Sequence, residues 1–203
     1  MAGEHALMPM SARRLDSSRW GNLHPEPSCQ STGSACVTVN VAVMHDWRSD
    51  RVGAAIEGRN PTVLWELDAS FAVIGDVQFL PGYCVALTKV RGVDRLSDLP
   101  RAERIRYLGD VDLLATAVEN VCSARDGSYR RVNVEILGNT DAFLHAHVWP
   151  RYGWEPEALV GKPVWLYPPD NWRDKQYALS AFHDSLRSAL EAELAKLATS
   201  WRA

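Results

Sequence analysis

Apolar and polar residues alternate in several short runs along this chain. The runs cover residues 62–67, 70–75, 82–90, 128–137 and 142–149. Alternation with a period of two predicts β-strands, because successive side chains of a strand point to opposite faces. Short turns, such as the one at Pro81–Gly82, separate neighbouring runs. Strands joined in this way pair antiparallel, so we expect an antiparallel sheet of about five strands.

Two longer segments instead repeat their apolar residues with the period of an α-helix. The first lies within residues 96–124, where Ser97 or Asp98 is expected to cap the helix and Pro100 to lie in its first turn. Its apolar stripe comprises Ile105, Leu108, Val111, Leu114, Ala115, Val118, Val121 and Cys122. The second is predicted over residues 174–199, with Tyr177, Phe182, Leu186, Ala189, Leu190, Leu194 and Leu197 along one side.

These elements predict an α+β fold, in which a long helix packs on the antiparallel sheet and a second helix follows at the C-terminus. A short helix is also expected over residues 50–57, ended by Gly58. Residues 44–160 are expected to form the main domain and residues 161–203 a C-terminal extension with the amphipathic helix.

The first 43 residues differ in composition from the rest of the chain. They are rich in Ser, Pro, Gly and Arg and show no sustained period, so we expect them to be disordered or extended. The run at 37–43 alternates valines and is compatible with an edge strand. Ordinary globular sequence begins at Met44, which raises the hypothesis that Met44 is the physiological start.

Composition narrows the classes of function. Hydrophobic residues make up 46% of the chain and the formal net charge is -3, which fits a globular protein and gives no basic field for nucleic acid or an anionic membrane. The four cysteines are scattered and form no C-x-x-C pair, so reduced thiols are expected. We find neither a membrane-length apolar run nor the apolar start of a secretory signal, and expect a cytoplasmic location.

The chemistry of the chain concentrates in the last of the predicted strands. His145 and His147 are two residues apart, so their imidazoles share one face of the strand with Phe143 and Trp149. Two imidazoles on one face are compatible with three roles. They are hydrogen-bonded structural groups, or they bind a metal with Asp141 or Glu135 as a third ligand, or one attacks phosphorus while the other contacts the phosphate oxygens.

The residues around the histidine strand favour a phosphate-bearing ligand. Gly138, Asn139 and Thr140 form a predicted turn whose backbone N–H groups, amide and hydroxyl suit phosphate oxygens. Asn133 offers a further amide from the preceding strand, and Arg151 places a guanidinium just after the histidine strand. The two common glycine-rich phosphate-loop motifs are absent from the sequence, and the net charge is low, so any phosphate-bearing ligand would be held by a local site.

The segment "NVEILGNTDAFLHAHVWPRY" resembles the signature of the histidine-triad nucleotide hydrolases and transferases. The resemblance is closest to the branch similar to diadenosine-polyphosphate hydrolases, and it extends over about residues 62–152. The order of a Pro-Gly turn, a strand, "LSDL", a long helix, a Gly-Asn turn and the histidine strand carries it. It implies the fold already inferred, a nucleotide or dinucleotide substrate, no cofactor and a possible homodimer.

By position, His145 matches the nucleophile of that family and His147 matches its third histidine, which contacts the phosphate. The resemblance also assigns nucleotide contacts to Asn133, Gly138, Asn139 and Thr140, and places Asp76 and Gln78 near the ribose-binding position. Phe143 stands where the family has its first histidine. This departure keeps a second hypothesis open, that the chain binds a nucleotide without turning it over.

Overall fold

The computed structural model describes residues 46–201. Its strands are β1 (Val63–Glu66), β2 (Ser70–Ile74), β3 (Cys84–Thr88), β4 (Tyr129–Glu135) and β5 (His145–Tyr152). Every pair is antiparallel, and the order across the sheet is β1-β2-β3-β5-β4. The predicted five-stranded antiparallel sheet is therefore confirmed. The predicted strand at 37–43 and the hypothesis on Met44 concern residues outside the described part of the chain.

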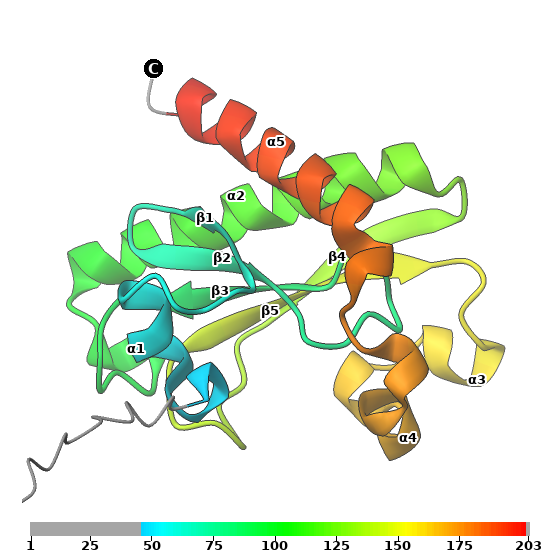
Figure 1. Cartoon of the computed structure of the whole chain (residues 1–203), viewed down its shortest axis with the longest axis horizontal. Helices are drawn as coiled ribbons and strands as arrows, with labels where there is room; N and C mark the ends of the chain where they lie inside the picture. Colours follow the sequence, from blue (N-terminus) through cyan, green and yellow to red (C-terminus); the bar gives the residue numbers. More distant parts are fainter. Residues whose placement is uncertain (1–45, 202–203) are drawn as a thin grey trace, which may run out of the picture. The chain divides into compact units, whose positions relative to one another are not determined.

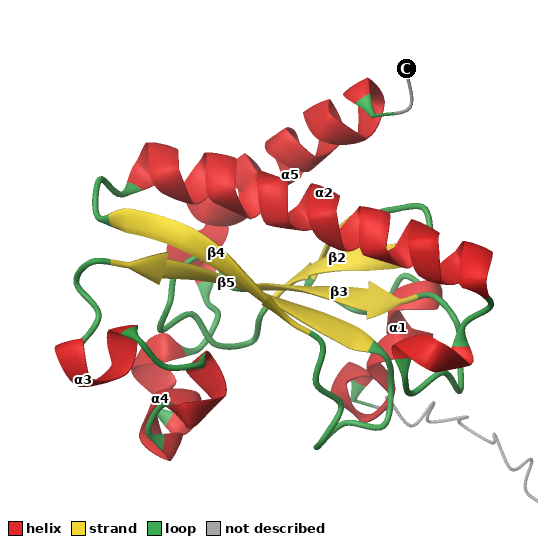
Figure 2. Ribbon diagram, turned by 180° about the vertical axis from the view of Figure 1, so that it is seen from behind, coloured by secondary structure: helices red, strands yellow, loops and turns green. Residues whose placement is uncertain are grey.

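One face of the sheet packs on the long helix α2 (Arg101–Arg125), which lies across it (Figure 2). Alternation along β5 directs Leu144, Ala146 and Val148 to this side, where all three are buried. A second helix, α5 (Asp184–Ser200), crosses α2 (Figure 1) and places Leu186, Leu190, Leu194, Leu197 and Ala198 in the same hydrophobic core. The predicted α+β architecture is thus confirmed for the described residues.

Three short helices lie on the side of the sheet opposite α2. These are α1 (Arg51–Ile56), α3 (Glu157–Val160) and α4 (Pro169–Arg173), and all three lie below the sheet in Figure 2. Single 3-10 turns link the larger elements at Trp47–Asp50, Leu96–Asp98, Val164–Leu166, Lys175–Tyr177 and Ala181–His183. Val52 and Ala55 of α1 form a small second cluster with Phe71, Val73 and Leu87 of the sheet. Among the described residues, no helix is both long and apolar enough to span a membrane.

The predicted helix over 174–199 is wrong in its first ten residues. The backbone of Tyr177 accepts from Gln78 N at 2.7 Å, and Leu179 N donates to Asp76 O at 2.8 Å. These bonds hold the chain extended beside residues 76–78, so a continuous helix is excluded and α5 begins only at Asp184. Phe182, placed in the apolar stripe, is 89% exposed.

The apolar stripe predicted for α2 is correct only from Val111 onward. Ile105 and Leu108 are exposed, whereas Tyr107 and Asp110 are buried. Tertiary hydrogen bonds set this rotation. The Tyr107 hydroxyl donates to Ala86 O at 2.9 Å, and the Asp110 carboxylate accepts from Ala69 N at 2.7 Å and from the Ser70 hydroxyl at 2.9 Å. The expected side-chain cap is also wrong, because Pro100 precedes the helix and Asp98 bonds the backbone of Asp94 and Arg95 instead.

β5 runs three residues beyond its predicted end, through Pro150. Proline lacks the N–H that a central strand donates. Here β3 pairs with β5 only as far as Val148, so Pro150 faces β4 alone. The strand therefore continues to Tyr152 without leaving an acceptor of β3 unpaired.

Asp110→Asn tests the tie between α2 and the turn of β1 and β2. The amide keeps the size of the carboxylate but turns an N–H₂ group toward backbone and hydroxyl donors. We expect the free energy of unfolding to fall by about 2 kcal/mol, measured by urea denaturation. Asp112→Asn, on the exposed side of the same helix, is the control. Equal stabilities of the two variants would contradict the proposed tie.

Candidate active site

The register of the sheet brings the two histidines beside apolar residues of β3. His145 pairs with Leu87 and His147 with Val85. All four side chains lie on the face opposite α2, because Ala146 and Ala86 between them point into the main core. The two imidazoles are perpendicular, with ring centroids 4.7 Å apart. The two imidazoles therefore lie in contact with each other on one face of the sheet, beside the apolar side chains of Val85 and Leu87.

A cavity of about 280 Å³ opens in front of both imidazoles. Val73 and Val85 supply part of its apolar lining, and Asp76 and Arg51 stand at its wall, joined by an ion pair of 2.5 Å. Trp172 of α4 reaches the same cavity from the C-terminal segment. The histidines thus line a hollow with an apolar side and a charged side, which suits a ligand with both characters.

The hydrogen bond of His145 fixes which ring nitrogen is free. Its Nδ1 lies 2.8 Å from the carbonyl oxygen of Phe143. A carbonyl only accepts, so Nδ1 carries the proton and Nε2 of the neutral ring has the lone pair. The side chain of His145 is otherwise buried, with 7% of its surface exposed. Nε2 is the nitrogen available for chemistry in the cavity.

His147 is held by Tyr83. The Tyr83 hydroxyl and Nδ1 of His147 are 2.7 Å apart. Burial and, to a smaller extent, the nearby imidazole of His145 together lower the pKa of His147 to about 4. At neutral pH His147 is therefore uncharged, and it contributes a hydrogen bond to the cavity rather than a full positive charge.

The Gly-Asn turn lies on another side of His145. Gly138 and Asn139 line a second cavity of about 630 Å³, which His145 also borders together with Arg95 and Arg104. Gly138 has φ of +110°, a conformation that favours glycine. Thr140 is exposed and lines neither cavity, whereas Asp141 lines the first. Of the predicted turn residues, Gly138 and Asn139 are brought to His145.

Three other residues expected at the site lie elsewhere. Gln78 bonds the backbone of Gly75, Gly82 and Tyr83 and so shapes the Pro-Gly turn. Arg151 is 3% exposed, and its guanidinium donates to the buried Glu155 carboxylate at 2.8–3.0 Å and to backbone carbonyls. Asn133 lies against this same guanidinium. The three residues line neither cavity, because the backbone and Glu155 already use their polar groups.

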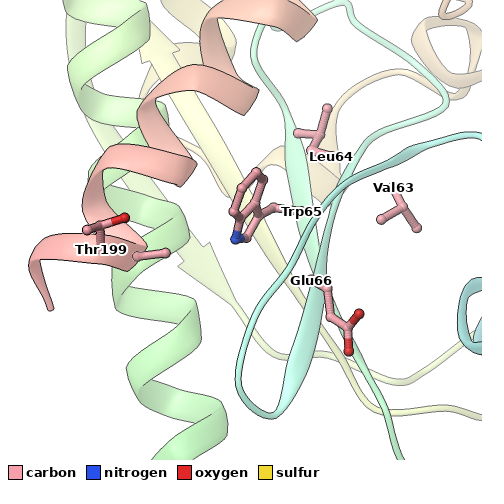
Figure 3. Close-up of a pocket in the computed structure, with 6 residues that line it drawn as sticks. Val63, Leu64, Trp65, Glu66 and Thr199 are labelled. Carbon is pink, nitrogen blue, oxygen red and sulfur yellow. The ribbon is translucent and has the colours of Figure 1, made fainter. Parts of the chain in front are cut away.

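Neither a metal site at the histidine pair nor a second hollow elsewhere in the described residues offers a comparable set of reactive side chains. Within residues 46–201, no three His, Cys, Asp or Glu side chains lie close enough to hold a metal ion, so neither Asp141 nor Glu135 joins the histidine pair as a third ligand. A separate hollow of about 590 Å³ lies between β1 and the end of α5, where Figure 3 shows Trp65 extending from β1 toward α5. Its lining contains Glu66 as its one charged residue and no histidine.

Several residues that line the first cavity have no recognisable signal in the amino-acid sequence. Arg51 begins α1, and Asn60 and Thr62 precede β1, yet all three line the first cavity. Asn60 and Thr62 are buried and bonded to each other, with the Thr62 hydroxyl 2.7 Å from the Asn60 amide oxygen. Tyr83 does have a marker in the sequence, because it directly follows the Pro-Gly turn.

The fold is that of histidine-triad proteins. A histidine triad protein from Marinobacter aquaeolei superposes with a TM-score of 0.53 at 21% identity, over 66% of this chain and 89% of its own. One from Sinorhizobium meliloti gives 0.51 at 16%, over 66% and 87%. A histidine triad nucleotide-binding protein from Sulfolobus tokodaii, itself described as hypothetical, gives 0.52 at 11%, over 72% and 91%. No family model and no curated protein matches the sequence.

The lowered pKa of His147 predicts a pH-dependent stability. A histidine that titrates at about 4 in the folded chain and at 6.5 when unfolded binds its proton preferentially in the unfolded state. Its contribution is present above pH 6.5 and is lost as the pH falls to about 4, by about 3 kcal/mol. We expect His147→Asn to lose less stability than the parent chain between pH 7 and 4.5 in urea denaturation. Parallel curves for the two proteins would contradict the burial of a neutral imidazole.

Proposed function

We propose that the protein is a nucleotide hydrolase or nucleotidyl transferase that works through a nucleotidyl-histidine intermediate. The observation that carries the proposal is the bond from His145 Nδ1 to the Phe143 carbonyl, which leaves the Nε2 lone pair for attack at the cavities. Nε2 forms a bond to the α-phosphorus, and the phosphorus–oxygen bond to the leaving group breaks with its electron pair. Water or another acceptor then displaces His145 from phosphorus.

The surroundings of His145 supply donors for the phosphate oxygens. His147 is half-buried beside it and neutral, and Asn139 with the backbone of Gly138 borders the same ring from the second cavity. Such donors stabilise charge that develops on the nonbridging oxygens of the transition state. These donors are neutral. A hydrogen bond inside a protein is electrostatically stronger than one in water, so neutral donors can stabilise the charge on the phosphate oxygens.

The first cavity supports a nucleoside as the ligand. Val73, Val85 and Leu87 offer an apolar surface for a base, and Asp76 at the wall offers carboxylate oxygens to ribose hydroxyls. The volume of about 280 Å³ suits one nucleoside better than two. In this arrangement the second cavity receives the leaving group, because His145 borders both hollows.

The substrates that fit this division are dinucleoside polyphosphates or related adenylated compounds. Each places an α-phosphate between a nucleoside and a leaving group of variable size. The resemblance to the diadenosine-polyphosphate-hydrolase-like branch and the histidine triad nucleotide-binding protein from Sulfolobus tokodaii support a nucleotide ligand. The second cavity, which Arg95 and Arg104 line, offers cationic groups to a polyphosphate chain.

One observation favours the alternative of a nucleotide-binding module without turnover. Phe143 replaces the first histidine of the triad and packs with α1 and Leu87, so it adds no polar group to the cavity. A labelled, acid-labile adduct formed from an α-labelled dinucleoside polyphosphate would distinguish an enzyme from a binding module.

His145→Ala is the direct test of the nucleophile. We expect turnover of a dinucleoside polyphosphate to fall by at least ~10³-fold and the labelled adduct to disappear, because no other ring nitrogen takes its place. His183→Ala is the matched control, since His183 is a buried histidine near the start of α5 and lines neither of the two cavities around His145. Turnover near the parent rate in His145→Ala would remove this residue from the nucleophile role.

Chelation tests the metal-dependent alternative. The described residues offer the histidine pair no third carboxylate or thiolate ligand, and the proposed displacement needs none. We expect turnover to persist after exhaustive dialysis against EDTA. Loss of turnover on dialysis, with recovery on adding back a divalent cation, would favour a metal-dependent phosphohydrolase.

A further inference from the structure

The hydroxyl of Tyr83 has a single hydrogen-bond partner among residues 46–201, Nδ1 of His147, at 2.7 Å. Tyr83 is 6% exposed and lines the wall of the first cavity. Nothing in the assignment of His145 as nucleophile uses this residue. Its contact with the second histidine is a buried polar contact that the reaction scheme leaves unexplained.

The direction of this bond follows from the chemistry of its two partners. Burial raises the pKa of Tyr83 far above its ordinary value, so the phenol keeps its proton at any working pH. If Nδ1 of His147 also carried a proton, the buried phenol O–H would have no acceptor among the described residues. An unpaired buried donor is costly, so the hydroxyl donates to Nδ1. The proton of the neutral imidazole is then on Nε2.

The tyrosine ring is itself held in place. It stacks on Trp149 with ring centroids 3.5 Å apart and an interplanar angle of 7°. Gly75 lies against its other side, where a Cβ atom would come within 2.1 Å of the ring. A stacked ring beside a glycine leaves the hydroxyl little freedom to move away from His147.

We infer that Tyr83 is a positioning residue, which holds His147 in the tautomer with its proton on Nε2, opposite to the tautomer of His145. The Phe143 carbonyl and the Tyr83 hydroxyl impose these opposite tautomers on two adjacent rings. The pair then presents one lone pair and one N–H donor to the same cavity. The tautomer follows from the contacts alone, whereas its effect on turnover rests on the proposed function.

Nitrogen NMR of the full chain labelled with ¹⁵N-histidine tests the tautomers without any substrate. Single substitutions of His145 and His147 assign their signals. We expect Nδ1–H for His145 and Nε2–H for His147 at pH 7. In Tyr83→Phe, which keeps the ring stacked on Trp149 and removes only the hydroxyl, we expect a mixture of tautomers at His147. The pKa of His147 should also rise, because the donor that favoured the neutral ring is gone.

Tyr107→Phe is the matched control. It removes another buried hydroxyl bonded to β3, to Ala86 O at 2.9 Å, but on the face that packs against α2. We expect it to leave both tautomers and the pKa of His147 unchanged. Nδ1–H at His147 in the parent chain, or an unchanged His147 signal in Tyr83→Phe, would overturn the inference.

Kinetics separate this inference from the proposed function. For a dinucleoside polyphosphate we expect Tyr83→Phe to lower kcat by about 10- to 100-fold with little change in KM, as for other groups that orient a functional histidine. If His145→Ala keeps its activity while the NMR result stands, the proposed function fails and the tautomer assignment remains. A Tyr83→Phe variant with the parent kcat in an otherwise His145-dependent enzyme would overturn the positioning role.

Discussion

The antiparallel pairing of β3 with β5 is the constraint on which the site depends. It aligns Cys84 with Val148 and Leu87 with His145, so alternate residues of both strands face α2 and the residues between them face the cavity. A shift of one residue would place both imidazoles in the apolar core and expose its alanines and valines. Packing of the core on the α2 side of the sheet therefore fixes the position of His145 and His147 on the other side.

The face of β5 that carries the histidines is open to a cavity at its first end and covered at its second end. His145 and His147 border a cavity, whereas Trp149 and Arg151 are closed off by the segment after the strand. The Glu155 carboxylate bonds the Arg151 guanidinium, the backbone of Tyr152 and the Tyr167 hydroxyl. Removing one partner from such a buried pair would leave an unpaired charge, so the pair keeps this end of the strand closed. The open and closed ends differ because the chain after β5 covers one and leaves the other open.

The local pattern of apolar and polar residues is sufficient to predict the five strands, but not the orientation and bounds of the helices that pack on them. The five strands follow from alternation and from turns such as Pro81–Gly82, which act over a few residues. The rotation of α2 is not encoded in the local pattern, because Asp110 bonds a turn more than forty residues earlier. The start of α5 is likewise set by distant residues, because residues 177–179 bond to residues 76–78. Arg151 lies outside both cavities for a different reason. Glu155, four residues later, pairs with its guanidinium, and the strand pattern alone does not predict this pairing.

The effect of Phe143 is decided by which of its atoms the site uses. The contact that sets the His145 tautomer comes from the backbone carbonyl of residue 143, so any side chain at that position provides it. The centroids of the Phe143 and His145 rings are 4.9 Å apart. The phenyl ring also packs against the small apolar cluster that contains Val52 and Leu87. Phenylalanine at this position adds no polar group to the cavity but leaves the carbonyl that orients His145, the proposed nucleophile, in place. A site with two histidines therefore keeps the two functions that attack at phosphorus requires, a lone pair and a donor, provided that Tyr83 holds the second ring.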